Sequence, residues 1–109
     1  MQRKTLVRSA LAVAIATLGF GAFAQGSYPT KPIRLIVPFP PGGSVDYVAR
    51  TISQKLAENI GQSVVVDNKG GASGTIGTYE ASRAAPDGYT LLLVFDSHAV
   101  NGSLYDIKY

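Results

Sequence analysis

Three short runs of aliphatic and β-branched residues, each ending in a loop of glycine, proline or polar residues, constrain this chain most. The first run, Ile33–Val37, is interrupted only by Arg34, which is typical of a strand buried in a parallel sheet. The runs Ser63–Asp67 and Tyr89–Phe95 repeat the pattern. Parallel strands need a crossover between them, so the segments that join these runs should contain helices.

Helical periodicity occurs between the predicted strands. After the first strand, apolar residues recur at helical spacing at Val45, Val48, Ala49, Ile52, Leu56 and Ile60. Ser44 is a good N-cap for this helix, Asp46 lies in its first turn, and Gly61 is a natural stop. A second and weaker helical pattern covers Thr75–Ala85.

The remaining segments complete a parallel α/β pattern. Pro86-Asp87-Gly88 is a turn, because proline presets φ and glycine accepts a positive φ. The polar stretch Asp96–Ser103 after the third strand is predicted to be a loop, with Leu104–Tyr105 as a short helical turn. Strand, helix, strand, helix, strand predicts a βαβαβ unit with right-handed crossovers.

The first 24 residues are predicted to be a cleaved secretory signal peptide. Met1–Arg8 is basic, Ser9–Phe23 is apolar, and Ala22-Phe23-Ala24 provides small residues at a cleavage site. The alternative is a membrane anchor, but the apolar run is shorter than the ~20 residues that span a bilayer. We therefore expect residues 25–109 to form the exported, periplasmic protein.

Charge and cysteine content exclude several classes of function. Arg3, Lys4 and Arg8 account for the whole formal charge of +3, and the other charges alternate in sign along the chain. Nucleic-acid binding therefore has no electrostatic support. The chain has no cysteine, which excludes disulfides and thiolate metal sites.

The loop Pro38–Gly43 combines stiff and permissive backbone directly before the first helix. Its later prolines fix φ and lack an N–H, and the two glycines after them let a ligand approach the backbone. The amides that follow lie at a helix N-terminus, where unpaired N–H groups and the helix dipole favour an anion. These residues allow two interpretations, an anion site and a plain strand-to-helix turn.

The second loop, NKGGASGTIG at Asn68–Gly77, allows a similar pair of interpretations. Ser73 and Thr75 offer hydroxyl donors, whereas the glycines equally suit close packing of a helix on a sheet. Ala72 breaks the G-x-G-x-x-G pattern, and no G-K-[ST] is present, so a nucleotide site is not predicted.

The third loop contains the adjacent residues Asp96, Ser97 and His98. Members of a catalytic triad must converge in space, and neighbours in an extended loop point apart, so hydrolysis is disfavoured. A single histidine without carboxylates at ligand spacing also disfavours a metal site. We expect Ser97 or His98 to make a polar contact at a cleft rim, or His98 to cap the loop. All three loops follow parallel strands and should meet at one sheet edge, where such sheets bind ligands.

Four motifs, in order and spacing, resemble the N-terminal part of the Bug-type extracytoplasmic solute receptors of tripartite tricarboxylate transporters. They are YPTKPIRLIVPFPPGGSVDYVAR, GQSVVVDNKGGASGTIG, AAPDGYTLLL and SHAVNGSLY, and the resemblance covers Tyr28–Tyr109. It implies the first lobe of a two-lobed periplasmic-binding-protein fold (type II, Venus-flytrap), with a small carboxylate held between α/β lobes.

The resemblance also implies which residues face the ligand cleft. The family motifs P-F-P-P-G-G-x-x-D, N-x-x-G-x-x-G-x-x-G and T-H-A-x-N fall on the three loops, with Ser97 in place of the threonine. The predicted ligand-binding residues are Phe39, Pro40, Pro41, Gly42, Gly43, Ser44, Asp46, Gly71, Ser73, Gly74, Thr75, Ser97 and His98.

The sequence thus predicts an exported receptor that binds a small organic acid and passes it to membrane permease subunits. Hydrogen bonds from the Gly42–Ser44 amides and the Ser73–Thr75 region would hold the carboxylate, without covalent chemistry, cofactor, metal or nucleic acid. Family members are longer and have a second lobe, so we expect residues 25–109 to be an incomplete first lobe that binds weakly. The alternatives are a remnant of a disrupted receptor gene, a small periplasmic interaction module, and a hydrolase using Ser97 and His98.

Overall fold

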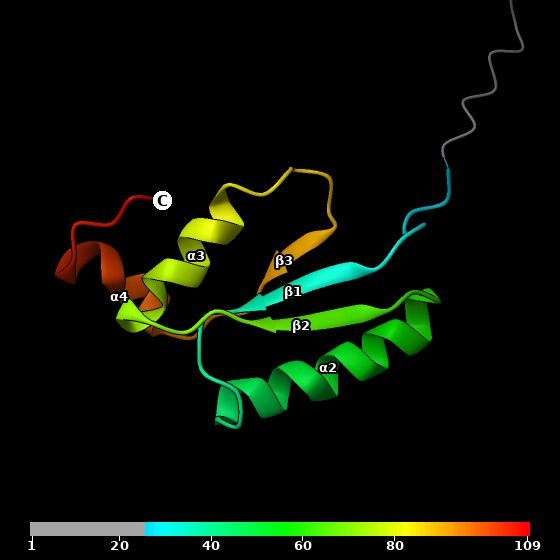
Figure 1. The fold of residues 1–109 in the computed structure, drawn as a ribbon, viewed down its shortest axis with the longest axis horizontal. Coiled ribbons are helices and arrows are strands. Elements are labelled where there is room, and N and C mark those ends of the chain that lie inside the picture. Colours follow the sequence, from blue (N-terminus) through cyan, green and yellow to red (C-terminus); the bar gives the residue numbers. More distant parts are fainter. Residues whose placement is uncertain (1–25) are drawn as a thin grey trace, which may run out of the picture.

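A computed structural model describes residues 26–109, so the predicted signal peptide lies outside the described residues. The centre of the fold is a three-stranded sheet in the order β2-β1-β3 (Figure 1). Its strands are β1 (Ile33–Val37), β2 (Val64–Asn68) and β3 (Thr90–Leu92). Both outer strands run parallel to β1, which confirms the predicted parallel α/β sheet.

The central strand fixes the register of both its neighbours. Leu35 pairs with Val66 on one side and with Leu91 on the other. The third strand was expected to continue to Phe95, but it ends at Leu92. Leu93 still donates its N–H to Ile36 O at 3.0 Å, but β1 ends at Val37 and gives way to the proline-rich loop, so the residues after Leu93 have no strand beside them.

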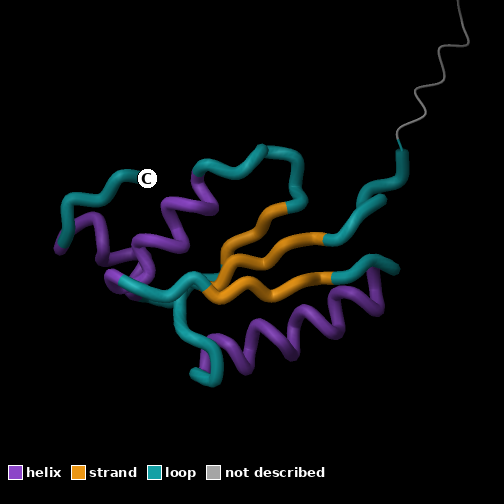
Figure 2. The backbone as a smooth tube through the Cα atoms, viewed as in Figure 1, coloured by secondary structure: helices purple, strands orange, loops and turns teal. Residues whose placement is uncertain are grey.

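The helices lie on both faces of this sheet (Figures 1 and 2). Helix α2 (Ser44–Ile60) packs over β1 and β2, and α3 (Thr75–Ser82), which follows a 3-10 turn, packs against β1 and β3. Gly61 ends α2 as predicted, with a φ of 68° and its N–H donated to Ala57 O. None of the helices within residues 26–109 is long and apolar enough to cross a bilayer.

The prediction of a loop at Asp96–Ser103 is wrong, because Ser97–Leu104 forms helix α4. The Asp96 carboxylate accepts the N–H of Ser97 at 2.8 Å and so caps the helix. The predicted second helix is also shorter than expected. It ends at Ser82, and Arg83 and Ala84 donate to carbonyls three residues back, in the tighter bonding typical of a helix end.

The apolar core lies between α2 and the sheet. Buried Leu35 and Val37 pack with Val45 and Ala49 of α2, and half-buried residues extend the cluster: Phe39, Val64, Val66 and Leu93. Val48 and Ile52, predicted to share this face, are 39% and 46% exposed. Helix α2 covers β1 and β2, so among the described residues no element covers the flank that carries these two side chains.

Arg34 points away from this core and ties three elements together on the opposite face. Its Nε donates to Asp67 Oδ2 of β2 at 2.8 Å, and its guanidinium also pairs with Glu80 of α3. The hydrogen bonds to Glu80 and Asp67 raise the pKa of Arg34. The one charged residue in the first predicted strand is therefore accommodated by two carboxylates.

Gly77 lets α3 approach the end of β1. A Cβ at this position would lie 2.8 Å from both Lys69 O and Pro38 Cβ. We expect Gly77→Ala to lower the free energy of unfolding by about 1–3 kcal/mol, as overpacking does. Urea unfolding measures the change. Gly102→Ala in α4, where the nearest atom is Ile107 Cδ1 at 3.5 Å, is the control, and equal losses in both variants would contradict the packing role.

Candidate functional site

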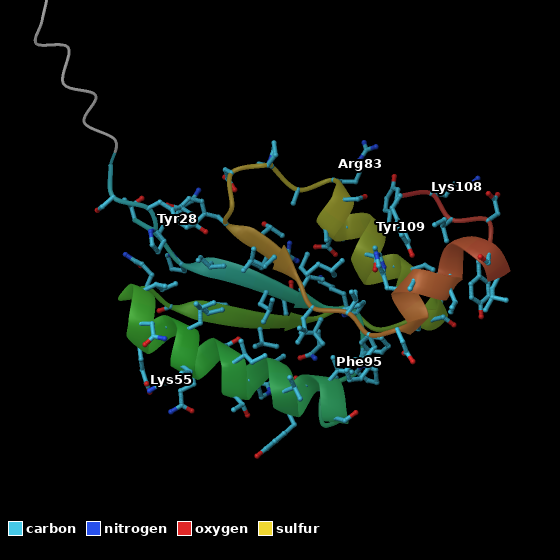
Figure 3. All side chains as sticks on the ribbon, turned by 180° about the vertical axis from the view of Figure 1, so that it is seen from behind. Tyr28, Lys55, Arg83, Phe95, Lys108 and Tyr109 are labelled. Atoms are coloured by element: carbon cyan, nitrogen blue, oxygen red, sulfur yellow. The ribbon has the colours of Figure 1, made fainter. Side chains whose placement is uncertain are left out.

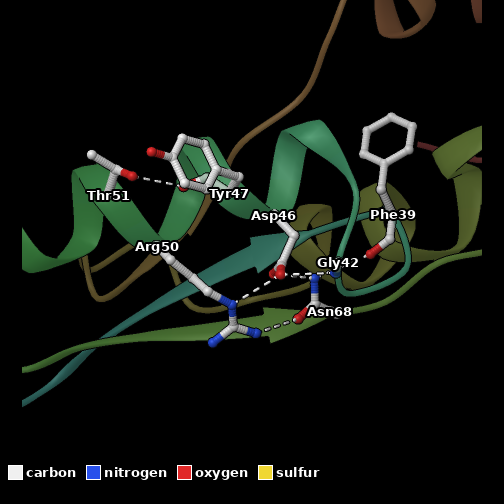
Figure 4. Close-up of polar contacts among 7 residues, drawn as sticks. All are labelled: Phe39, Gly42, Asp46, Tyr47, Arg50, Thr51 and Asn68. Carbon is white, nitrogen blue, oxygen red and sulfur yellow. Dashed lines mark hydrogen bonds and ion pairs between the residues drawn. The ribbon is translucent and has the colours of Figure 1, made fainter.

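The carboxylate of Asp46 organises the loop that follows β1 (Figure 4). Its Oδ2 accepts the Gly42 N–H at 3.0 Å and Arg50 Nε at 2.9 Å, and its Oδ1 accepts Asn68 Nδ2 at 3.0 Å. Asn68 Nδ2 also donates to Phe39 O at 3.2 Å. Donors from the loop, α2 and β2 thus converge on one side chain that is only 7% exposed.

These contacts hold the pKa of Asp46 at about 2, below its ordinary value of 3.8. The hydrogen bond from Arg50 lowers it most, followed by those from Gly42 and Asn68. Burial acts in the opposite direction and is outweighed. Asp46 is therefore ionised at neutral pH, and its oxygens are occupied by donors from the chain itself.

The first turn of α2 leaves backbone donors free at the loop. Gly43, not Ser44 as predicted, is the N-cap, and it provides no side-chain hydrogen bond. The first helical bond runs from Tyr47 N–H to Gly43 O at 3.0 Å. Because the first amides of a helix have no intrahelical acceptor, those of exposed Ser44 and buried Val45 have none at the positive end of this 17-residue helix.

The second loop is shaped by its own internal bonds. The Thr75 hydroxyl donates to Ala72 O at 2.8 Å, and the Gly74 amide donates to Gly71 O. Ala72 and Ser73 have φ values of 47° and 55°, a region that residues with a side chain rarely occupy. This conformation is supported by buried Asn101 of α4, whose Nδ2 donates to Ser73 O at 3.0 Å.

The segment that follows β3 brings the start of α4 to the sheet edge where the other two loops lie. Ser97 is half-buried in the first turn of α4, and the His98 ring stacks on Tyr109 with ring centroids 5.5 Å apart. Successive residues on a helix do not face each other. Ser97 and His98 therefore lack the arrangement of a nucleophile and its base.

Direct contacts join the three segments. The rings of Phe39 and Phe95 lie 6.0 Å apart, and Phe95 lies near the N-terminal end of α2 (Figure 3). A Cβ on Gly70 would be 3.1 Å from Pro40 N, so the second loop touches the first. The strand order reverses at β1, and the crevice outside the carboxyl ends at such a switch point is the usual ligand position in α/β sheets.

A separate cavity of about 870 Å³ lies between α3 and residues 105–109. Ser73 and Thr75 line it, together with Tyr79, Arg83 and Tyr109, and Figure 3 shows Arg83 and Tyr109 on this side of the molecule. No residue of the Pro38–Ser44 segment contributes to its lining. The cavity is therefore separate from the loop that follows β1.

The predicted residues fall into three groups. Phe39, Pro40, Gly43 and Ser44 lie at the switch-point edge. A second group forms hydrogen bonds within the chain: the Asp46 carboxylate with the Gly42 amide, Gly71 with Gly74, and the side chains of Ser73 and Thr75. Pro41 is exposed beside the first group, and Ser97 and His98 begin α4.

Three contributors to this site, Arg50, Asn68 and Phe95, were absent from the predicted ligand-binding residues. Arg50 could have been found from its spacing, because an acidic and a basic residue four positions apart on a helix can form an ion pair. Phe95 was assigned to a strand, so its position beside Phe39 had no counterpart in the expected structure.

The fold and this edge define a class, the parallel α/β proteins in which ligands bind outside the carboxyl ends of the strands. The family model described as "Tripartite tricarboxylate transporter family receptor" matches residues 48–109, more than half of the chain. The chain belongs to this family, which confirms the resemblance seen in the sequence.

Relatives and solved structures agree with this assignment. Protein BugT of Bordetella pertussis is 48% identical over 90 residues, which are 82% of this chain and 28% of BugT. MatC from Rhodopseudomonas palustris, solved with bound malate, superposes with a TM-score of 0.69 at 34% identity, over 75% of this chain and 29% of MatC. R. palustris Rpa4515, solved with adipate, superposes with a TM-score of 0.60 at 42% identity, over 62% of this chain and 22% of Rpa4515. The chain thus spans less than a third of these proteins.

The low pKa of Asp46 predicts how stability depends on pH. A carboxylate whose pKa is lower in the folded state stabilises fully above its unfolded value of 3.8 and loses this effect as the pH falls through about 2. We expect Asp46→Asn to be less stable than the parent protein at pH 6, and the difference to shrink steadily between pH 4 and pH 2. Urea unfolding across this range measures it.

Asp106→Asn is the control, since Asp106 is 89% exposed in its pair with Lys108. That variant should match the parent protein at every pH. A destabilisation by Asp46→Asn that stays constant down to pH 2 would show that the carboxylate charge has no part in holding the loop.

Proposed function

We propose that the protein acts as a solute-binding receptor whose edge at the switch point binds a carboxylate of a small organic acid. The observation that carries this proposal is the pair of free amides, Ser44 and Val45, at the start of a 17-residue helix whose entry loop is fixed by Asp46. A helix N-terminus attracts anions through its N–H groups and its dipole. Similarity to proteins solved with malate and adipate supports a carboxylate as the ligand.

The predicted residues divide into contacting and supporting roles. Gly43, Ser44 and Val45 present amides to the carboxylate, while Phe39, Pro40 and Pro41 line the crevice. Asp46 and Gly42 fix the loop, and Gly71, Ser73, Gly74 and Thr75 shape the second loop beside it. Ser97 and His98 lie at the rim. This division replaces the expected donors Gly42, Gly74 and Thr75, because those groups bond within the chain.

From the family we infer where the receptor acts and to which proteins it delivers its ligand. After export to the periplasm, the receptor would deliver its ligand to the permease subunits of a tripartite transporter. The chain spans 28% of BugT, and a binding protein of this fold closes two lobes over its ligand. The lobe described here would therefore supply one side of the cleft. Binding and release need no covalent step, which fits a receptor and not an enzyme.

A proline substitution tests the amide site without removing the helix. Proline is favoured at the first position of a helix, and Gly43, with φ −83° and ψ 175°, has the conformation that a following proline requires. Ser44→Pro should retain stability but lose one N–H to the ligand. We expect affinity for malate or adipate to fall about tenfold or more, the effect of losing a hydrogen bond to a charged group.

Isothermal titration with malate and adipate, accompanied by thermal-shift measurements, gives this comparison. Ser44→Ala is the matched control, because it removes the hydroxyl and retains the amide. Equal affinities in Ser44→Pro and the parent protein would place the carboxylate elsewhere. Stabilisation by an unrelated neutral solute, with none from a broad set of carboxylates, would overturn the ligand class.

Export is tested separately at the N-terminus. We expect mass spectrometry of periplasmic protein to find a mature chain beginning at Gln25, since Ala22 and Ala24 occupy the positions that signal peptidase recognises. Ala24→Leu should block cleavage and leave a larger, membrane-associated form. Unprocessed parent protein in the cytoplasm would contradict the proposed export.

A further inference from the structure

We propose that Arg50 is a positioning residue for the ligand loop, which it holds through Asp46 and Asn68. Arg50 lies one turn after Asp46 on α2. Its Nε donates to Asp46 Oδ2 at 2.9 Å and its Nη2 donates to Asn68 Oδ1 at 3.3 Å (Figure 4). For its effect on ligand binding, the inference rests on the proposed carboxylate site.

Arg50 acts on the loop through two relays. Asp46 accepts the Gly42 amide, and Asn68 donates to the Phe39 carbonyl, so each partner of Arg50 bonds the loop backbone. These two bonds fix the loop at both ends of its proline pair. A guanidinium has a rigid fork of donors that reaches two acceptors at once, which the single ammonium of lysine does not reproduce.

The bond to Asn68 also sets the direction of that amide. With Arg50 donating to Oδ1, the Nδ2 group faces Asp46 Oδ1 and Phe39 O. The opposite orientation would place the Asn68 oxygen against two acceptors and release both bonds. Removal of the guanidinium therefore weakens contacts that Arg50 does not itself make.

Charge gives Arg50 a second effect on an anionic ligand. The Asp46 carboxylate lies in the same helical turn as the Ser44 and Val45 amides, and its negative charge opposes a carboxylate there. Arg50 compensates this charge. Without it, the ligand would approach a helix end whose favourable dipole is offset by a buried anion.

Arg50→Gln and Arg50→Lys test the positioning role. Lys55→Gln is the matched control, because Lys55 lies on the same helix in an exposed pair with Glu58 at 2.8 Å. In the absence of ligand, we expect amide hydrogen exchange of Gly42, followed by NMR, to be about tenfold faster in Arg50→Gln than in the control. Arg50→Lys should fall between them. Gly42 exchange in Arg50→Gln that matches the control would overturn the inference.

Binding of malate and adipate tests whether Arg50 acts through Asp46. Arg50→Gln should bind about tenfold more weakly than the parent protein, as expected when a hydrogen bond to a charged group is lost. The same substitution should cost less affinity in Asp46→Asn protein, where the carboxylate that Arg50 holds and compensates is already gone. An equal loss of affinity in both backgrounds would overturn the action of Arg50 through Asp46.

The two readouts separate this inference from the proposed function. If the parent protein binds no carboxylate while Gly42 exchange responds to Arg50→Gln, the ligand assignment fails and the positioning role is supported. If the parent protein binds malate or adipate and neither exchange nor affinity responds, the amide site stands and the role of Arg50 is overturned.

Discussion

The buried carboxylate of Asp46 is the interaction on which the edge of this lobe depends. Residues 40–43 of the proline- and glycine-rich loop are exposed and gain little from side-chain packing, and the chain has no cysteine with which to fix them. Asp46 supplies the missing constraint by accepting bonds from the loop, from α2 and from β2. An ionised group can be buried here because three donors replace the water it loses.

The strand order explains why this one residue reaches so many elements. In the order β2-β1-β3, the loop after β1 borders the ends of both neighbouring strands. Asn68 ends β2 and bonds Phe39, while Phe95 follows β3 and packs against the same residue. On the opposite face, Gly77 brings α3 against Pro38, and Arg34 joins β1 to β2 and α3. The position of β1 therefore determines where the loops that follow all three strands lie.

Residue patterns predicted the features that depend on local chemistry or on periodicity. The first strand, the second strand to within one residue, and the end of α2 followed from β-branched runs, helical spacing and Gly61, whereas the N-cap of α2 was predicted one residue late. Helix α4 was missed although Asp96 is a favoured N-cap, because its sequence, SHAVNGSL, has a weak apolar pattern. The third strand was predicted too long because its end is set by the length of β1, which is a tertiary constraint. The motifs placed the correct loops at the edge, but they did not distinguish donors that bond internally from donors that remain free.

Whether a loop donor remains free depends on whether the chain itself provides an acceptor close to it. Gly42, Gly74 and Thr75 all lie in loops that a sequence pattern marks as ligand-facing, yet each gives a donor to a nearby oxygen of the chain. The amides of Ser44 and Val45 differ, because the geometry of a helix denies them an acceptor whatever their side chains are. Arg34 and Arg50, the two arginines at the sheet, are already paired with carboxylates. Recognition of an anion at this edge would therefore depend on backbone amides and the helix dipole, and on Arg50 only indirectly, through its hold on Asp46 and Asn68 and its compensation of the Asp46 charge.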